Sequence, residues 1–121
     1  MRTADLTDAL LDYHTARAEG VPAADLELRA NGTLCVQYLR GTPGKIVAVQ
    51  VLDYSTNWAL AGPLVEKHGF KLDMYATADG ASWCADRDGC AEARGDTPMI
   101  AICRAVVRAA FGDEVEDLPC P

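Results

Sequence analysis

A short polar run, residues 54–58, follows an apolar segment and stands directly in front of a predicted helix. A second polar segment, residues 94–98, precedes another predicted helix in the same way. The first turn of a helix offers unpaired N–H groups and the positive end of the helix dipole, which suit a polar or anionic ligand. With the added hydroxyl groups, amide and indole, these loops predict a site for a small polar or nucleotide-like ligand. The candidate ligand-binding residues are Tyr54, Ser55, Thr56, Asn57, Trp58, Asp96 and Thr97.

The same residues also have a purely structural interpretation. Asn and Thr are favoured N-cap residues, so Asn57 and Thr97 could simply begin helices. Trp58 could pack in the core, because a tryptophan buries a large apolar area. We place capping and core packing first, and the ligand site second.

Motifs of catalysis and of metal binding are incomplete in this sequence. Ser55, Thr56 and Cys84 are possible nucleophiles, yet no pattern places a base beside them. The five cysteines include no CxxC pair, which argues against a zinc site. The segment "GTPGK", residues 41–45, lacks the first glycine and the final Ser or Thr of a phosphate-binding loop, so we interpret it as a turn. We predict no cofactor and no metal, favour a non-enzymatic role while leaving enzyme activity open, and keep a small hydrolase as an alternative.

The charge of the chain limits its partners. The net charge is −7, and residues 53–121 hold 12 acidic and 6 basic residues. Such a chain is unsuited to binding nucleic acid through its phosphate backbone, which requires a basic surface. No apolar run reaches membrane-spanning length, and no signal-peptide pattern opens the chain, so we expect a cytoplasmic protein with reduced thiols.

Two segments predict the first two helices of the chain. Residues 4–18 have helical apolar spacing, with Thr3 as N-cap and a solvated face that includes Asp12. In the second segment, Pro63 is too deep for a helix that starts after Asn57. We favour a helix that begins at Pro63 after a short 3₁₀ turn over 58–61, with a continuous, kinked helix as the alternative.

The last helix is predicted over residues 98–111, with Thr97 as N-cap and Gly112 as its end. Apolar residues cover most of its circumference, which indicates a helix packed on more than one side. Arg104 and Arg108, four residues apart, mark a narrow polar stripe. We expect this helix to be the centre of the core.

Five segments have the composition of strands. Asn31-Gly32 predicts a hairpin between 26–30 and 33–39, with a bulge or a one-residue slip because the apolar patterns of the arms do not match. Residues 46–52 are apolar and β-branched, which predicts a buried strand. Residues 70–76 alternate as a half-buried strand, and 81–85 form the next one. The residues on the inward face of 70–76 are predicted to be Phe70, Leu72, Met74 and Ala76.

These elements predict an α+β fold in a single domain, residues 1–121, with an acidic tail at 113–121. An antiparallel sheet of about four or five strands would carry two or three packed helices, with the C-terminal helix central. Strands separated by short turns, combined with helices at the two ends of the chain, are typical of this class.

Several segments resemble a known family. "LTDALLDYHTARAEG", "YSTNWALAGPLVEKHG", a lone tryptophan at Trp83 and "GDTPMIAICRAVVRAAFGDEVEDLP" are similar in order and spacing to the NinX-like family of small phage and prophage proteins, over about residues 5–119. The resemblance implies a phage or prophage origin, and brings neither an activity nor catalytic residues. We therefore expect an acidic accessory protein that binds a host protein in the host cytoplasm, for example as an antagonist of host defence. Sequestration of a small nucleotide-like ligand is the alternative.

Overall fold

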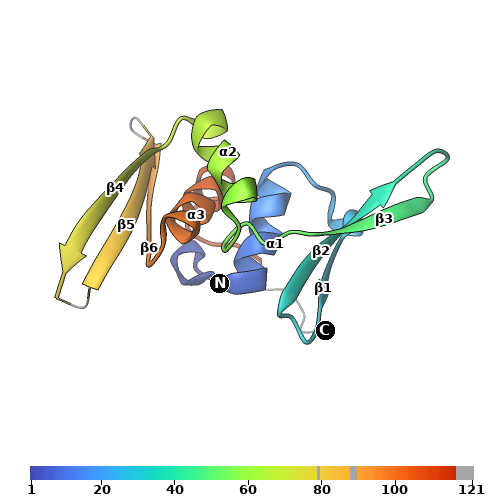
Figure 1. The fold of residues 1–121 in the computed structure, drawn as a ribbon, viewed down its shortest axis with the longest axis horizontal. Helices are drawn as coiled ribbons and strands as arrows, with labels where there is room; N and C mark the ends of the chain where they lie inside the picture. Colours follow the sequence, from blue (N-terminus) through green and yellow to red (C-terminus); the bar gives the residue numbers. More distant parts are fainter. Residues whose placement is uncertain (79, 88–89, 117–121) are drawn as a thin grey trace.

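Two three-stranded antiparallel sheets lie on either side of a layer of helices (Figure 1). The computed structural model describes residues 1–78, 80–87 and 90–116. Within these residues the helices are α1 (Asp8–Ala18), α2 (Trp58–His68) and α3 (Pro98–Phe111). The first sheet contains β1 (Leu26–Arg29), β2 (Leu34–Arg40) and β3 (Ile46–Val51), and the second contains β4 (Lys71–Thr77), β5 (Gly80–Arg87) and β6 (Cys90–Gly95). Two short 3₁₀ turns cover Thr3–Asp5 and Ala23–Asp25.

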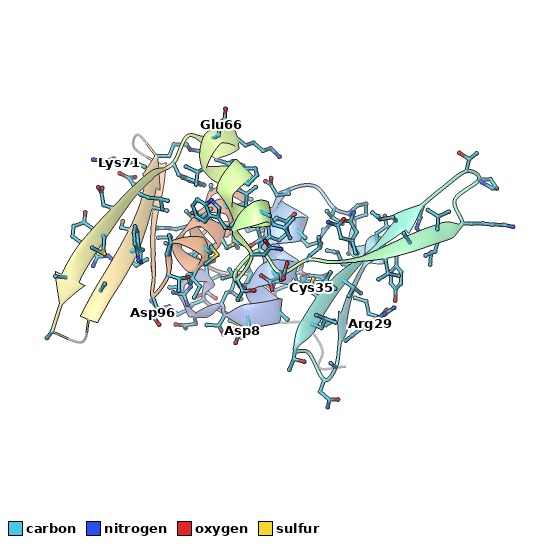
Figure 2. All side chains as sticks on the ribbon, viewed as in Figure 1. Asp8, Arg29, Cys35, Glu66, Lys71 and Asp96 are labelled. Carbon is cyan, nitrogen blue, oxygen red and sulfur yellow. The ribbon has the colours of Figure 1, made fainter. Side chains whose placement is uncertain are left out.

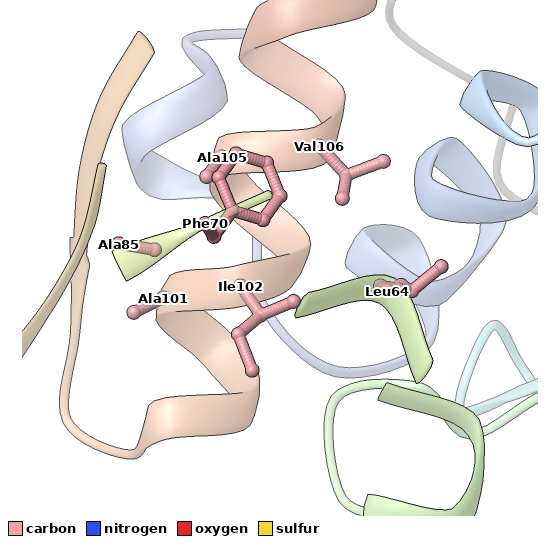
Figure 3. Close-up of a cluster of buried hydrophobic side chains, with 7 residues drawn as sticks. All are labelled: Leu64, Phe70, Ala85, Ala101, Ile102, Ala105 and Val106. Atoms are coloured by element: carbon pink, nitrogen blue, oxygen red, sulfur yellow. The ribbon is translucent and has the colours of Figure 1, made fainter. Parts of the chain in front are cut away.

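Helix α3 is the centre of the molecule, as predicted from the apolar residues that cover most of its circumference. It contacts α1 and α2 on one side and strands β5 and β6 on the other. Figure 3 shows the main cluster, in which Ile102 and Val106 of α3 face Leu64 of α2 and Phe70. The prediction of an α+β fold with antiparallel strands and a central C-terminal helix is confirmed.

The strands are divided between two sheets, where the sequence suggested one. Sheet β1-β2-β3 packs on α1, and sheet β4-β5-β6 packs on α3. Strand β6 was not predicted, because "CAEARG" lacks the β-branched and aromatic residues that mark strands. Pairing with β5 and packing against α3 hold it in place.

The first hairpin has a four-residue loop in place of the two-residue turn that Asn31-Gly32 suggested. Arg29 pairs with Leu34, and the loop residues Ala30, Asn31 and Gly32 have φ values of 53°, 58° and 83°. The register is the one that a two-residue turn would also give, so Val36 stands opposite Glu27, and the predicted bulge or slip is absent from this pair of strands. The bulge lies in the next pair of strands, between Leu39 and Arg40 of β2 and the start of β3.

Helix α1 begins at Asp8, four residues later than predicted, and Thr7 is its N-cap residue. Thr3 does not cap this helix, because its hydroxyl donates to the carbonyl of Gly112 at 2.7 Å. The assignment of Asp12 to a solvated face is also wrong, since its side chain is buried. The reason is that α1 packs between α3 and the first sheet, so two of its faces are covered.

Helix α2 runs from Trp58 through Pro63 without a break, so the expected start at Pro63 is wrong and the continuous alternative holds. Proline has no N–H, and the carbonyl of Ala59 therefore loses its usual partner. Ala59 is exposed, so water can bind this carbonyl at low cost. Gly69 ends the helix in the left-handed region, with φ 69°.

Strand β3 is exposed along its whole length, which contradicts the prediction of a buried strand. It is an edge strand, and the β2–β3 hairpin extends away from the helices, so no layer covers it (Figure 1). Strand β4 is likewise an edge, and Met74 and Ala76 are exposed there, although Phe70 is buried as predicted. In both cases the composition of the strand did not predict that it lies at the edge of its sheet.

Candidate functional site

The loop before α2 caps that helix. The side-chain oxygen of Asn57 accepts the N–H of Ala59 at 3.0 Å, and its amide nitrogen donates to the Asp53 carboxylate at 3.1 Å. The N–H groups of Thr56 and Asn57 both donate to the carbonyl of Asp53. These bonds fix the loop as a compact turn, and the predicted capping role of Asn57 is confirmed.

Tyr54 and Ser55 point into the protein. Tyr54 packs against all three apolar clusters of the core, and burial raises the pKa of its hydroxyl. The N–H of Ser55 donates to the buried Asp12 carboxylate at 2.7 Å. The hydroxyl oxygen of Ser55 is buried and has no hydrogen-bond partner among the described residues. Both residues therefore join α1 to the loop before α2.

Asp12 is the ionisable group in this contact. Burial raises its pKa to about 6, against the opposing effect of the hydrogen bond from the Ser55 main chain. Asp12 then holds its proton more tightly in the folded state than in the unfolded chain. Its stabilising contribution is complete below pH 4 and is lost as the pH rises through about 6.

Asp12→Asn should remove this pH dependence, because the amide oxygen can still accept the Ser55 N–H but carries no charge. Between pH 4 and pH 7 we expect the free energy of unfolding of the variant to rise by about 2 kcal/mol relative to the wild type. Urea unfolding at several pH values measures this difference. Glu66→Gln removes the same charge at an exposed position of α2 and serves as control. A constant difference between Asp12→Asn and wild type across this range would contradict the prediction.

Thr56 and Trp58 are the exposed members of the loop. The hydroxyl of Thr56 lies 3.4 Å from the carbonyl of Asp53, and Trp58 is 52% exposed. The interpretation of Trp58 as a core residue is therefore wrong. Its ring lies against Gly62, where an added Cβ would stand 2.9 Å from the indole nitrogen. The glycine lets the indole lie along the surface of α2, and leaves much of the ring accessible.

The loop before α3 has a similar structure. The hydroxyl of Thr97 accepts the N–H of Ile100 at 3.2 Å, so its predicted capping role is confirmed. Asp96 is exposed at the end of β6 (Figure 2). Each loop is thus held by bonds to its own helix, and a shared ligand site at the two loops stays a prediction.

Two cavities lie elsewhere, and none of the seven predicted residues lines either one. One, of about 340 Å³, lies between α1 and residues 111–116. His14 lines it, burial lowers the pKa of this imidazole, and its Nε2 has no hydrogen-bond partner in the described part of the chain.

The other cavity, of about 550 Å³, lies between residues 2–4, β6 and α3. Arg104 and Arg108, the polar stripe of the last helix, line it together with Arg2 and Arg94. The stripe was the only sequence signal for this cavity. Tertiary contacts bring Arg2 and Arg94 to the cavity, so the sequence alone could not predict that they line it.

Three of the five cysteines are buried in the core. Cys35, Cys84 and Cys103 are buried, and burial raises the pKa of Cys35 and Cys103 to about 12. Such thiols form little thiolate and are unreactive. Cys120 and the part of the predicted acidic tail beyond residue 116 lie outside the described residues. Within the described ranges, no cluster of three metal-ligating side chains and no membrane-spanning helix was found.

The protein is thus a small α+β protein in which the polar loops before α2 and α3 cap these helices. Exposed apolar and charged residues lie elsewhere on its surface. The family model described as "Bacteriophage P22, NinX" matches residues 2–110, and the chain therefore belongs to this phage family. The resemblance noted in the sequence is thereby confirmed. A comparison with curated proteins gave no match.

Proposed function

We propose that this phage protein is a non-enzymatic accessory protein that binds a host protein through the edge strand β3. One observation carries the proposal: all six residues of β3 are exposed, although four of them are β-branched and apolar. Ile46, Val47, Val49 and Val51 are each 45–68% exposed. Exposed apolar residues gathered on one element mark interaction sites in small proteins.

The main chain of β3 supports recognition by strand addition. The N–H of Leu52 donates to the Cys35 carbonyl in β2. Because main-chain groups alternate in an antiparallel ladder, those of Val49 and Val51 face away from β2. An extended segment of a partner can bind these groups as a further strand, and its alternate side chains can contact the apolar residues of β3.

Charge indicates what kind of segment fits. The chain has no acidic residue between Glu27 and Asp53, but three basic residues lie there, so this stretch carries +3 and the rest of the chain −10. Arg40 is paired with Asp25 at 2.6 Å, and Lys45 stands beside the start of β3. A partner segment with apolar residues and an acidic flank opposite Lys45 is therefore complementary to β3.

A host segment fits this edge better than a second copy of β3. In a twofold pair centred on Val49, the bulge at the start of each β3 would lie opposite Val51 of the other copy and interrupt the ladder. Membership of a phage family makes a protein of the host, including one of its defence systems, the natural partner.

Val49→Lys should weaken binding of the host protein at least tenfold without changing the melting temperature, because Val49 is already solvent-exposed. The partner is first identified by capture from host lysate with wild-type protein, and is then purified for calorimetric titration. Met74→Lys is the matched control, since Met74 is 60% exposed on β4, the edge of the other sheet. Equal affinity of wild type and Val49→Lys would refute the role of β3.

Hydrogen exchange provides a second readout with the purified partner. Strand addition should protect the amides of Val49 and Val51 in the complex. Sedimentation of the protein alone tests self-pairing. A dimer that Val49→Lys converts to a monomer would assign β3 to a second copy and overturn the proposal of a host partner.

A further inference from the structure

The larger cavity gathers an unusual amount of positive charge. Four of the eight arginines in the chain line it, and among the described residues of its lining Asp113 is the only acidic one. The described residues of the lining therefore carry +3 in a protein whose net charge is −7. An anion bound among these arginines would be stabilised by their positive charge.

The four arginines come from three parts of the fold. Arg104 and Arg108 stand one turn apart on α3, and Arg94 lies on the neighbouring strand β6. Arg2 comes from the N-terminal segment, which forms a bridge to Glu114. The wall of the cavity is fixed there by Thr3, whose N–H donates to the carbonyl of Asp113 at 2.8 Å.

Arg104 is held in place and keeps donors for a ligand. Its Nε donates to the Leu6 carbonyl at 3.0 Å, and its Nη1 donates to the Arg94 carbonyl at 2.8 Å. These bonds use two of the five N–H donors of a guanidinium. In the described part of the chain, no carboxylate lies within ion-pair distance of Arg104, which is half-buried. Burial lowers its pKa, although Asp96 and Asp5 act in the opposite direction.

Arg108 contributes a second oriented guanidinium. It forms an ion pair with Asp113 at 2.7 Å and lines the cavity at the next turn of α3. The other lining residues, Thr3, Ala4 and Ala93, are small. No aromatic ring on which a base could stack is among the described residues of the lining, so charge and hydrogen bonds must provide the recognition.

We propose that this cavity binds a small anion with two or more phosphate groups. Guanidinium groups match phosphate oxygens with paired hydrogen bonds, and several of them around one cavity favour a multiply charged ligand. A volume of about 550 Å³ lies within the range of small-molecule sites. The phosphate chain is the recognised part, whether it is free or belongs to a nucleotide. This site is separate from the two polar loops before the helices and from strand β3.

Calorimetric titration at low ionic strength tests the site with tripolyphosphate, adenosine triphosphate, adenosine and citrate. We expect both triphosphates to bind and adenosine to show no binding. Tighter binding of adenosine triphosphate would identify a nucleotide as the source, and equal binding a free polyphosphate. Citrate affinity equal to that of tripolyphosphate would overturn the phosphate assignment, and so would an absence of binding by both triphosphates.

Charge-removing variants locate the site. Arg104→Gln and Arg108→Gln should each weaken tripolyphosphate binding at least tenfold, because each loses charged hydrogen bonds to the anion. Arg104 also bonds two main-chain carbonyls, so Arg2→Gln provides a variant with less structural risk. Arg40→Gln removes the same charge from β2 and should leave the affinity within about twofold of wild type. Equal weakening by Arg40→Gln and the cavity variants would show a general charge effect and refute the site.

Discussion

Ile102→Ala should destabilise the protein more than any other truncation of a single α3 side chain to alanine. Ile102 is fully buried, and it packs where α3 meets α2 and the second sheet. Loss of its side chain leaves a cavity in a close-packed region, which costs about 2–5 kcal/mol. For a chain of this length the melting temperature should fall by roughly 10 °C. Urea unfolding gives the free energy directly.

Ile46→Ala is the matched control for Ile102→Ala, because it removes the same atoms from a residue that is 51% exposed on β3. An exposed side chain adds little to stability, so we expect a change below about 0.5 kcal/mol. The comparison also tests the exposure of β3 in solution. A loss at Ile46 as large as that at Ile102 would mean that β3 is buried, and would contradict the proposed binding edge.

The helices could be predicted from sequence where local chemistry decides them. Thr97 and Asn57 cap α3 and α2 because their side chains reach N–H groups two or three residues away. Thr3 illustrates the limit of this reasoning. Its hydroxyl bonds Gly112 at the other end of the chain, and no local pattern predicts such a choice of partner.

The position of each strand in its sheet could not be predicted. Residues 46–51 have the apolar composition of a central strand, and they form an edge. Residues 90–95 have little strand character, and they pair with β5 beside α3. Strand composition reflects packing on neighbours, which depends on the whole fold.

The two candidate sites differ in the same way. For the polar loops, the sequence identified residues that lie close together in the chain, and several of them have capping or packing roles. The arginine cavity combines Arg2 with Arg94, Arg104 and Arg108, which lie more than 90 residues further along the chain. Only the spacing of the last two arginines is visible in sequence. Sites assembled from distant segments require the fold before they can be found.

Gly95→Ala should destabilise the protein by about 1–3 kcal/mol, although it adds a single methyl group. Gly95 ends β6 and lies directly against the first turn of α3. An added Cβ would stand 2.6 Å from Cγ2 of Ile100 and 2.7 Å from the main-chain nitrogen of Ala101. The main chain of a helix that forms the core cannot yield, so β6 must move away from α3. Urea unfolding measures the cost.

Gly62→Ala is the control for Gly95→Ala, because the added Cβ would also meet a close neighbour there. That neighbour is the indole of Trp58, an exposed side chain that can rotate away. Alanine is favoured over glycine in a helix by about 1 kcal/mol, so we expect Gly62→Ala to be neutral or stabilising. If both variants were equally tolerated, the packing of β6 on α3 would be looser than the structure shows. The arginine cavity would then lose a fixed wall, since the Arg94 carbonyl that holds Arg104 lies beside Gly95.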